Sequence, residues 1–227
     1  MKTLNKEIQQ NITPRKALEI LKDGNTRFTN NLKANRNLLQ QVNDTSEGQW
    51  PFAVILSCID SRTSAELIFD QGLGDVFSVR IAGNIVNTDI IGSMEFACKV
   101  AGSKLIVVLG HSKCGAVKGA CDHIEMGNLT ELLSKLQPAV YQEKNTKSNR
   151  NSKNDVFVEN VSALNVKRSV KSIIERSYIL EKMLENGEIG IVGAMHDIDT
   201  GTVQFYEDVN YINDEKNPNF SIADLRY

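Results

Sequence analysis

Three short apolar runs, separated by segments with helical periodicity, constrain the fold of this chain more than any other feature. The runs cover residues 52–57, 76–83 and 105–109 and are rich in Val, Ile and Leu. Such runs are typical of strands covered on both faces, and their alternation with helices is typical of a parallel sheet. The sequence therefore predicts an α/β fold, with a central, largely parallel β-sheet flanked by helices and with residues 105–109 as a central strand.

The segments between and after these runs predict the helices and one hairpin. Helical periodicity is present at 13–32, 63–74, 89–101 and 161–186. Thr13 followed by Pro14 is a typical helix start. The helix at 89–101 is predicted to offer its apolar side chains to the core, namely Ile91, Met94, Phe96 and Ala97. Two apolar segments around a Thr-Gly pair predict a carboxyl-terminal hairpin over 189–208.

The chain is predicted to be a single domain over residues 1–227, with two regions that differ from the rest. Residues 1–45 form an amino-terminal helical arm, and its polar first part has little to bury against, which favours packing on another subunit. Residues 137–155 are rich in Asn, Lys and Ser. Because this composition buries little apolar surface, we expect a mobile surface loop there.

Composition and charge exclude several classes of protein. The 227 residues carry a formal net charge of -2, so no basic footprint for nucleic acid is evident. The apolar runs are far shorter than the roughly 20 residues of a membrane-spanning helix. The first ten residues lack the apolar segment of a secretory signal, so we expect a cytoplasmic protein. Its four cysteines should then stay reduced, as core residues, nucleophiles or metal ligands.

Two of the four cysteines lie where predicted strands end. Cys58 follows the first run, and His111 and Cys114 follow the third. If these strands are parallel neighbours, the three side chains converge at the carboxyl edge of the sheet, where ligands gather. Two thiolates and one imidazole suit zinc, and three protein ligands leave the fourth tetrahedral position open for water or substrate.

Asp60 and Arg62 strengthen the prediction of a catalytic metal site. A carboxylate beside the metal can accept a hydrogen bond from an attacking water, and a guanidinium can fix that carboxylate by a bidentate pair. The two residues are equally compatible with a local ion pair that caps the helix starting at Thr63. Cys98 and Cys121 are interpreted as core packing, and His123 and His196 as structural or solvent-exposed histidines.

Three sequence blocks resemble the β-class carbonic anhydrases. The blocks are Cys-Ile-Asp-Ser-Arg at 58–62, Ala-Gly-Asn-Ile-Val-Asn at 82–87 and Gly-His-Ser-Lys-Cys-Gly-Ala-Val at 110–117. The resemblance implies that Cys58, His111 and Cys114 bind one zinc ion per subunit and that Asp60 and Arg62 form the catalytic dyad. It also implies reversible hydration of carbon dioxide to bicarbonate and a proton, a lyase activity, in dimers or larger assemblies built through amino-terminal helices.

The same resemblance assigns a substrate pocket. The matching positions are Gln49, Phe77, Ala82, Phe96 and Gly115. Phe96 stands where an aromatic residue, often tyrosine, is expected. In dimers of the family, part of this pocket comes from the neighbouring subunit.

Two positions indicate a subclass. Members regulated by inhibitory bicarbonate carry a tryptophan three residues before the first zinc cysteine, where this chain has Ile55. Gln49 points the same way, so the resemblance implies the subclass that lacks the inhibitory site. Asp60 would then bind zinc only if the site closes.

Three other functions remain open at this stage. A hydrolase of carbon disulfide or carbonyl sulfide would use the same scaffold on a different linear molecule. A non-catalytic zinc-binding protein would have no need of Asp60 and Arg62. A redox thiol protein would require Cys58 or Cys114 to form a disulfide, which bound zinc would block.

Overall fold

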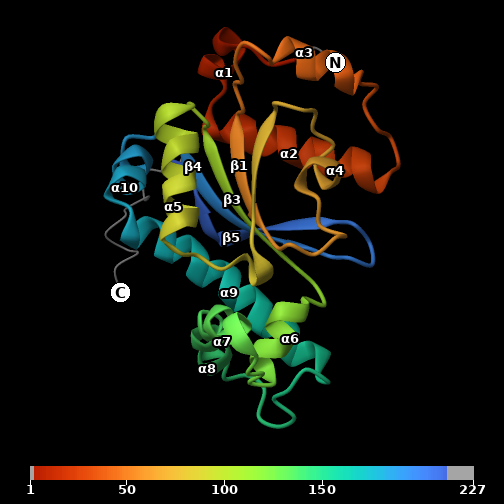
Figure 1. Ribbon diagram of the computed structural model, residues 1–227, viewed down its shortest axis with the longest axis vertical. Helices are drawn as coiled ribbons and strands as arrows, with labels where there is room; N and C mark the ends of the chain where they lie inside the picture. Colours follow the sequence, from red (N-terminus) through yellow and green to blue (C-terminus); the bar gives the residue numbers. More distant parts are fainter. Residues whose placement is uncertain (1–2, 214–227) are drawn as a thin grey trace.

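A five-stranded β-sheet forms the centre of the protein, in the order β2-β1-β3-β4-β5 (Figure 1). The computed structural model describes residues 3–213. The strands are β1 Ala53–Ser57, β2 Val76–Arg80, β3 Leu105–His111, β4 Gly190–His196 and β5 Val203–Tyr211. The first four strands run parallel, and β5 pairs antiparallel with β4. The predicted α/β fold, its central strand at 105–109 and its carboxyl-terminal hairpin are therefore confirmed.

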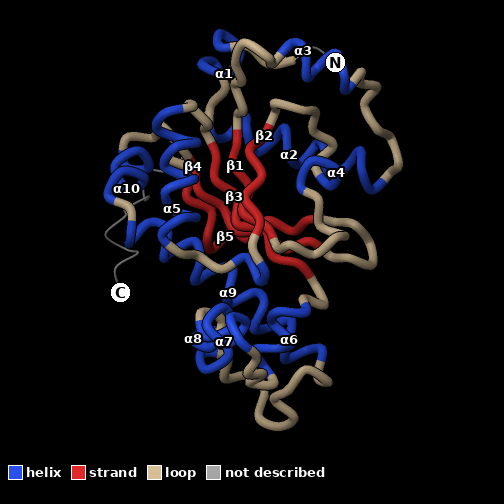
Figure 2. Tube along the Cα trace, in the orientation of Figure 1, coloured by secondary structure: helices blue, strands red, loops and turns tan. Residues whose placement is uncertain are grey.

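Helices surround this sheet on both faces and at one end (Figure 2). The first half of the chain contains α1 Lys6–Asn11, α2 Pro14–Thr29, α3 Leu38–Asp44, α4 Ala65–Ile68, the 3-10 helix η1 Ala82–Asn84, α5 Thr88–Glu95 and the π-helix η2 Phe96–Val100. The second half contains α6 Gly115–Cys121, α7 Gly127–Ser134, α8 Gln137–Gln142, α9 Asp155–Arg176 and α10 Tyr178–Glu185.

Each face of the sheet packs against its own set of helices. Helices α2 and α4 cover one face, where Leu18 and Leu21 of α2 are fully buried. Helices α5, α9 and α10 cover the other face. Helix α9 lies so close to the sheet that a Cβ atom on Gly110 would meet Val166 at 2.6 Å. Strands β1 and β3 are buried along their whole length, which explains their apolar sequences.

Helices α6, α7 and α8 form a lobe beyond the carboxyl ends of the parallel strands, next to the first part of α9 (Figure 1). A third apolar cluster fills this lobe and includes Leu136 and Phe157. Cys58 and Cys114 belong to the same cluster. Both cysteines therefore lie where the sheet meets the lobe.

Two predicted helices have different bounds in the structure. The helix expected at 63–74 is reduced to α4, because the chain turns at Asp70, where φ is 44°. The helix expected at 161–186 begins earlier and is divided at Ser177, whose side chain accepts a hydrogen bond from the N–H of Leu180 and so starts α10.

The run at 76–83 and Phe96 are less buried than predicted. Strand β2 is at the edge of the sheet, and its five residues are partly or fully exposed. Phe96 begins the π-helix η2 and is 54% exposed, so its assignment to the core of this chain is wrong. The other three predicted core residues of that helix are buried, namely Ile91, Met94 and Ala97.

The segment 137–155 is not a loop throughout. Residues 137–142 form α8, which buries Ala139 and Val140, so the loop prediction is wrong for this part. The rest turns around the buried carboxylate of Glu143, which accepts hydrogen bonds from Thr146 and Arg150. Mobility of this segment stays a prediction.

The amino-terminal region is only partly an arm. The side chain of Thr13 accepts a hydrogen bond from the N–H of Lys16 at 3.1 Å and starts α2 as predicted, but α2 packs on the sheet of its own chain. Helix α3 carries exposed apolar side chains, Leu38, Leu39 and Val42. Met1 and Lys2 of the predicted arm, and residues 214–227 of the predicted domain, lie outside the described residues. Within 3–213, no helix has the length and apolar character that a membrane span needs.

Candidate metal centre

Two neighbouring parallel strands bring the three predicted ligands together. Cys58 directly follows β1, His111 is the last residue of β3, and Cys114 precedes α6. Because β1 pairs with β3 in parallel, both strands end at the same edge of the sheet. The convergence predicted from the sequence is therefore present.

The three ligand atoms have the spacing of a metal site. Sγ of Cys58 lies 4.0 Å from Sγ of Cys114, and the ligand atoms of the two cysteines and His111 all lie within 4.8 Å of one another. Two thiolates on one tetrahedral zinc ion, each about 2.3 Å from it, would be separated by about 3.8 Å. All three residues are buried. Within 3–213 this is the one cluster of at least three such side chains with metal-ligand spacing.

The imidazole of His111 is oriented as a ligand. Its Nδ1 lies 2.9 Å from the backbone carbonyl oxygen of Ser112. A carbonyl can only accept, so Nδ1 carries the hydrogen and the lone pair is on Nε2. That Nε2 atom is buried and has no hydrogen-bond partner in the described part of the chain. A buried acceptor without a partner fits a bound metal ion.

The thiol of Cys58 is prepared for ionisation. Its pKa is lowered, first by the hydrogen bond from Cys114 and further by His111 and by the backbone N–H of Gly83, which lies 3.3 Å from Sγ. The pKa of Cys114 is raised, first by the same hydrogen bond to Cys58 and then by burial. The hydrogen bond between the two residues therefore favours the thiolate on Cys58 and the proton on Cys114. Gly83 has φ of 67°, and this backbone conformation explains the glycine in the block at 82–87.

Asp60 and Arg62 form a bidentate ion pair beside this cluster. Nε of Arg62 lies 3.0 Å from Oδ1 of Asp60, and Nη2 lies 2.8 Å from Oδ2. The hydrogen bonds from Arg62 hold the pKa of Asp60 far below its usual value of 3.8. Ser64 is the N-cap residue of α4, and no side chain caps this helix by a hydrogen bond. The alternative role of Asp60 as a helix cap is therefore wrong.

The turn between His111 and Cys114 is held by residues that sequence reasoning missed. Lys113 has φ of 57°, and its N–H donates to the carboxylate of Glu159 on α9 at 2.9 Å. The hydroxyl of Ser112 accepts from the N–H of Ile198 at 2.9 Å. Glu159 follows a polar segment and shows no spacing relation to the motifs, so the sequence gives no signal for it.

His196 lies beside His111, which the sequence did not indicate. The two residues are register partners at the ends of β4 and β3. Burial lowers the pKa of His196 to about 4, and its Nδ1 has no hydrogen-bond partner within the described residues. Burial therefore favours the neutral form of His196 next to the candidate metal site. The sequence favours either a structural or a solvent-exposed histidine at this position. Because His196 is buried and is not part of the three-residue cluster, only the structural alternative applies.

The predicted pocket residues fall into two groups. Ala82 adjoins Gly83, whose N–H contacts Cys58, and Gly115 follows Cys114 directly, so both adjoin the cluster. Phe77 does not: it pairs with Val54, three residues before Ser57 and thus about 10 Å along the strand from the carboxyl edge.

Phe77 lies instead against Phe96. Their ring centroids are 6.3 Å apart in an edge-on arrangement, and both rings border an open cavity of about 690 Å³. Gln49 is exposed and precedes β1, at the opposite end of that strand from Cys58. One chain therefore does not bring Gln49, Phe77 and Phe96 to its own candidate metal centre.

The remaining cysteines match their interpretation as packing residues. Cys98 and Cys121 are buried in apolar clusters. Burial raises the pKa of Cys98 to about 12 and that of Cys121 to about 11, so neither is a ready nucleophile or ligand. His123 is exposed, with its ring 6.3 Å from that of Tyr141.

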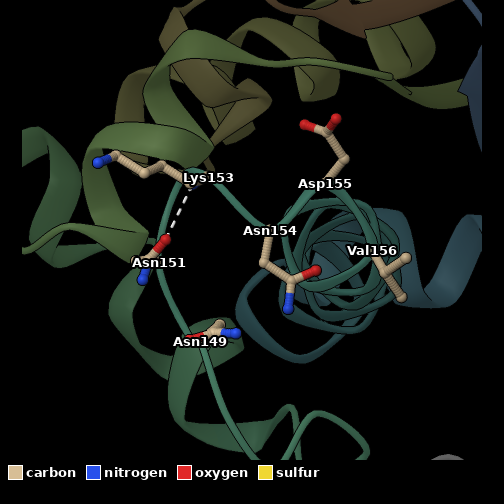
Figure 3. A pocket seen from close by; sticks show the side chains of 6 residues that line it. All are labelled: Asn149, Asn151, Lys153, Asn154, Asp155 and Val156. Carbon is tan, nitrogen blue, oxygen red and sulfur yellow. Dashed lines mark hydrogen bonds between the residues drawn. The ribbon is translucent and has the colours of Figure 1, made fainter.

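Another surface cavity, of about 490 Å³, lies at the start of α9 (Figure 3). It is lined by Asn149, Asn151, Lys153, Asn154, Asp155 and Val156. The N–H of Lys153 donates to the side chain of Asn151 at 3.0 Å, as the dashed line in Figure 3 marks. None of these residues is a predicted site residue.

An α/β fold with two cysteines and one histidine at the carboxyl edge of its parallel strands, and with a bidentate Asp-Arg pair beside them, defines a protein with a candidate catalytic metal site. Comparison with known proteins identifies the family to which a protein with this fold and site belongs. The family model for carbonic anhydrase matches residues 53–203. This chain belongs to the β-carbonic anhydrase family.

Two relatives and one solved structure agree with this assignment. Carbonic anhydrase 2 of Mycobacterium tuberculosis is 34% identical over 213 residues, which cover 90% of this chain and 99% of that protein. The carbonic anhydrase of Mycolicibacterium smegmatis is 33% identical, with 86% of this chain and 94% of the relative covered. A tetrameric β-carbonic anhydrase of Sordaria macrospora is similar in structure, with a TM-score of 0.62, 27% identity, and 71% and 83% of the two chains covered.

Proposed function

We propose that this protein is a zinc-dependent carbonic anhydrase that reversibly hydrates carbon dioxide to bicarbonate and a proton. The observation that carries the proposal is the buried Cys58, His111 and Cys114 cluster with the Asp60–Arg62 pair beside it. The unpartnered Nε2 of His111 supports metal binding, and the family supports zinc as the metal, one ion per chain.

A zinc ion bound by Cys58, His111 and Cys114 would lower the pKa of a coordinated water to about 7, which would supply a nucleophile at neutral pH. The chain's own residues orient that attack. Asp60 accepts a hydrogen bond from the attacking water and so directs the water's lone pair toward the carbon of the substrate. Arg62 keeps the Asp60 carboxylate ionised and fixed through two hydrogen bonds. Burial of the three ligands limits the access of bulk water to them.

The proposed pocket needs a second copy of the chain. Ala82 and Gly115 come from the same chain as the ligands, and Gln49, Phe77 and Phe96 are proposed to come from a neighbouring one. The exposure of Phe96 and of the edge strand β2 supports this, because an apolar edge is usually covered in the assembly. The tetrameric fungal relative supports a dimer or tetramer.

We also propose that the site is of the open kind, without inhibitory bicarbonate. Ile55 is fully buried in the apolar cluster beneath α2 and α4, where a tryptophan side chain would need extra volume. The bond of Asp60 to Arg62 keeps its carboxylate away from the metal position. Asp60 would bind zinc only if that pair breaks.

Measuring zinc content and gas hydration on the same sample tests the proposed function. We expect one zinc per chain and rapid hydration of carbon dioxide, followed by stopped-flow with a pH indicator. Parallel assays on carbon disulfide and carbonyl sulfide distinguish the nearest alternative, since those reactions release hydrogen sulfide. A zinc-loaded chain that converts none of the three compounds would be a non-catalytic zinc protein.

A further inference from the structure

Arg80, the last residue of β2, binds the backbone of the segment that carries Cys58 and Asp60. Its Nε donates to the carbonyl oxygen of Cys58 at 3.0 Å, and its Nη2 donates to the carbonyl oxygen of Asp60 at 2.7 Å. The side chain of Arg80 therefore binds both the candidate metal ligand Cys58 and the proposed hydrogen-bond acceptor Asp60 through their backbone carbonyls. Sequence reasoning assigned no role to it.

The parallel pairing of β2 with β1 explains why Arg80 reaches this segment. Arg80 is the register partner of Ser57, the residue just before Cys58. Beyond this pair the ladder continues with one more hydrogen bond, from the N–H of Ile81 to the carbonyl of Ser57 at 3.1 Å. After that point, the side chain of Arg80 replaces the missing strand as the donor to the next carbonyls. A planar guanidinium with donors in fixed directions suits two such acceptors better than an ammonium does.

The carbonyl of Asp60 is the junction of this arrangement. Besides Arg80, it accepts from the N–H of Thr63 at 3.0 Å and from the hydroxyl of Thr63 at 2.9 Å. The carboxylate of the same residue is held by Arg62. Asp60 is thus fixed twice, through its backbone by Arg80 and through its side chain by Arg62.

We propose that Arg80 is a positioning residue for the reaction: by clamping the carbonyls of Cys58 and Asp60, it sets the place of the Asp60 carboxylate relative to the Cys58 thiolate. The role rests on the proposed function, because it concerns the alignment of the hydrogen-bond acceptor with the metal position. Arg80 acts through these two residues and touches no reacting atom.

The consequence is a separation between metal binding and turnover. Cys58 is buried and follows a strand paired on both sides, so its thiolate stays in place without Arg80. Asp60 lies two residues further along an exposed loop and depends more on the clamp. A displacement of about 1 Å at a reacting group can lower the rate about a hundredfold. Removal of Arg80 should therefore retain zinc and lower kcat.

The test compares Arg80→Ala and Arg80→Lys with a matched control, Arg176→Ala. Arg176 is also exposed and also donates to a backbone carbonyl, that of Val86 at 3.4 Å. For each variant, zinc content, thermal midpoint, kcat, KM and the absorption spectrum of the cobalt(II)-substituted protein are measured. The Arg80→Ala variant is also assayed with added guanidinium ion at a concentration that leaves the wild type folded and active.

We expect Arg80→Ala to bind one zinc per chain, to lose about tenfold to a hundredfold in kcat with little change in KM, and to regain part of the loss with guanidinium. The absorption spectrum of its cobalt(II)-substituted form should shift, because the Asp60 carboxylate beside the metal position moves while the Cys58 thiolate stays in place. In Arg80→Lys the ammonium can reach one of the two carbonyl oxygens, so the kcat of this variant should lie between those of the wild type and Arg80→Ala. If Arg80→Ala fails to fold, Arg80→Lys decides the question on the same measurements.

Wild-type kcat and an unchanged cobalt spectrum in the Arg80 variants would overturn the proposal. So would a loss of activity that merely follows lost zinc, or an equal loss in Arg176→Ala. A zinc-loaded wild type that does not hydrate carbon dioxide would instead refute the proposed function. In that case, an unshifted cobalt spectrum of Arg80→Ala would still refute the clamp separately.

Discussion

The guanidinium of Arg62 holds the carboxylate of Asp60 by two hydrogen bonds, Nε to Oδ1 at 3.0 Å and Nη2 to Oδ2 at 2.8 Å. The backbone N–H of Arg62 adds a third, to Oδ1 at 2.9 Å. Three donors to one carboxylate fix both its charge and its direction. Exposed ion pairs contribute little to stability, so stability alone does not explain three hydrogen bonds to this carboxylate.

Replacing the Asp60 carboxylate by an amide should separate binding from catalysis. We predict that Asp60→Asn retains one zinc per chain and loses about a hundredfold or more in kcat/KM, because the amide cannot serve as the same charged acceptor. Metal analysis and stopped-flow hydration measure the two effects. Asp208→Asn, an exposed carboxylate paired with Lys167 on the surface, is the matched control and should be unchanged. Near-normal turnover in Asp60→Asn would remove Asp60 from the mechanism.

Replacing Arg62 should act on the same step less directly. In Arg62→Ala the pKa of Asp60 should rise toward its usual value of 3.8, since the hydrogen bond from Arg62 is the largest cause of its lowering. At neutral pH the carboxylate stays charged but loses its fixed direction. We therefore predict a loss in kcat nearly as large as that in Asp60→Asn, with zinc retained. Full activity in Arg62→Ala would show that the orientation of Asp60 does not depend on this pair.

The metal-free protein should contain one thiolate at neutral pH. The pKa of Cys58 is lowered, and that of Cys114 is raised by the hydrogen bond between them. Because a lowered pKa leaves the anion stable above it, we predict thiolate absorbance in the ultraviolet at pH 6, and its loss in Cys58→Ser. The control is Cys98→Ser, since the Cys98 thiol has a pKa of about 12 and should contribute nothing. The absence of thiolate at pH 6 in the metal-free wild type would contradict the arrangement.

Asp70 provides a prediction on stability and its pH dependence. Burial alone would raise the pKa of Asp70, but hydrogen bonds from Arg27 and Arg36, both at 2.5 Å, keep it below its usual value. A lowered pKa stabilises the folded state above the unfolded value, and this stabilisation is lost as the pH falls through the folded value. We predict that Asp70→Asn lowers the free energy of unfolding by about 3 kcal/mol at pH 7, because it leaves the buried guanidinium of Arg36 facing a neutral amide.

Urea unfolding at pH 7 and at successively lower pH measures this effect. The difference between wild type and Asp70→Asn should shrink as the pH falls, because the wild-type carboxyl becomes protonated as well. Asp208→Asn should change the free energy of unfolding by less than about 1 kcal/mol at every pH. A constant difference across the pH range would mean that the effect of Asp70→Asn does not come from charge.

The ligands of the candidate metal site could be predicted from the sequence because each of them lies at or just after the end of a predicted strand. Cys58 and His111 end two apolar runs, and parallel strands that pair end at one edge. Cys114 follows three residues after His111, within one turn. No long-range contact had to be known beyond the pairing of β1 with β3.

Other parts depend on contacts that no local pattern encodes. Strand β2 was expected to be buried, but the sheet order places it at an edge. Arg80 and Glu159 reach the site through strand register and through helix packing. Arg80 lies just before the block at 82–87, but the local pattern does not show which carbonyl oxygens its side chain binds. Residues 137–142 directly precede the polar segment and were predicted together with it, yet they form α8, whose Ala139 and Val140 are buried in a cluster with residues of α9.

Hydration activity as a function of bound zinc tests the central claim most directly. The metal is removed with a chelator, zinc is returned in steps, and carbon dioxide hydration is followed by stopped-flow at each step. We predict no catalysis in the metal-free protein and a linear return that ends at one zinc per chain, with no return in His111→Ala. Activity that survives removal of the metal, or a fully loaded chain that does not accelerate hydration, would contradict a catalytic zinc at Cys58, His111 and Cys114.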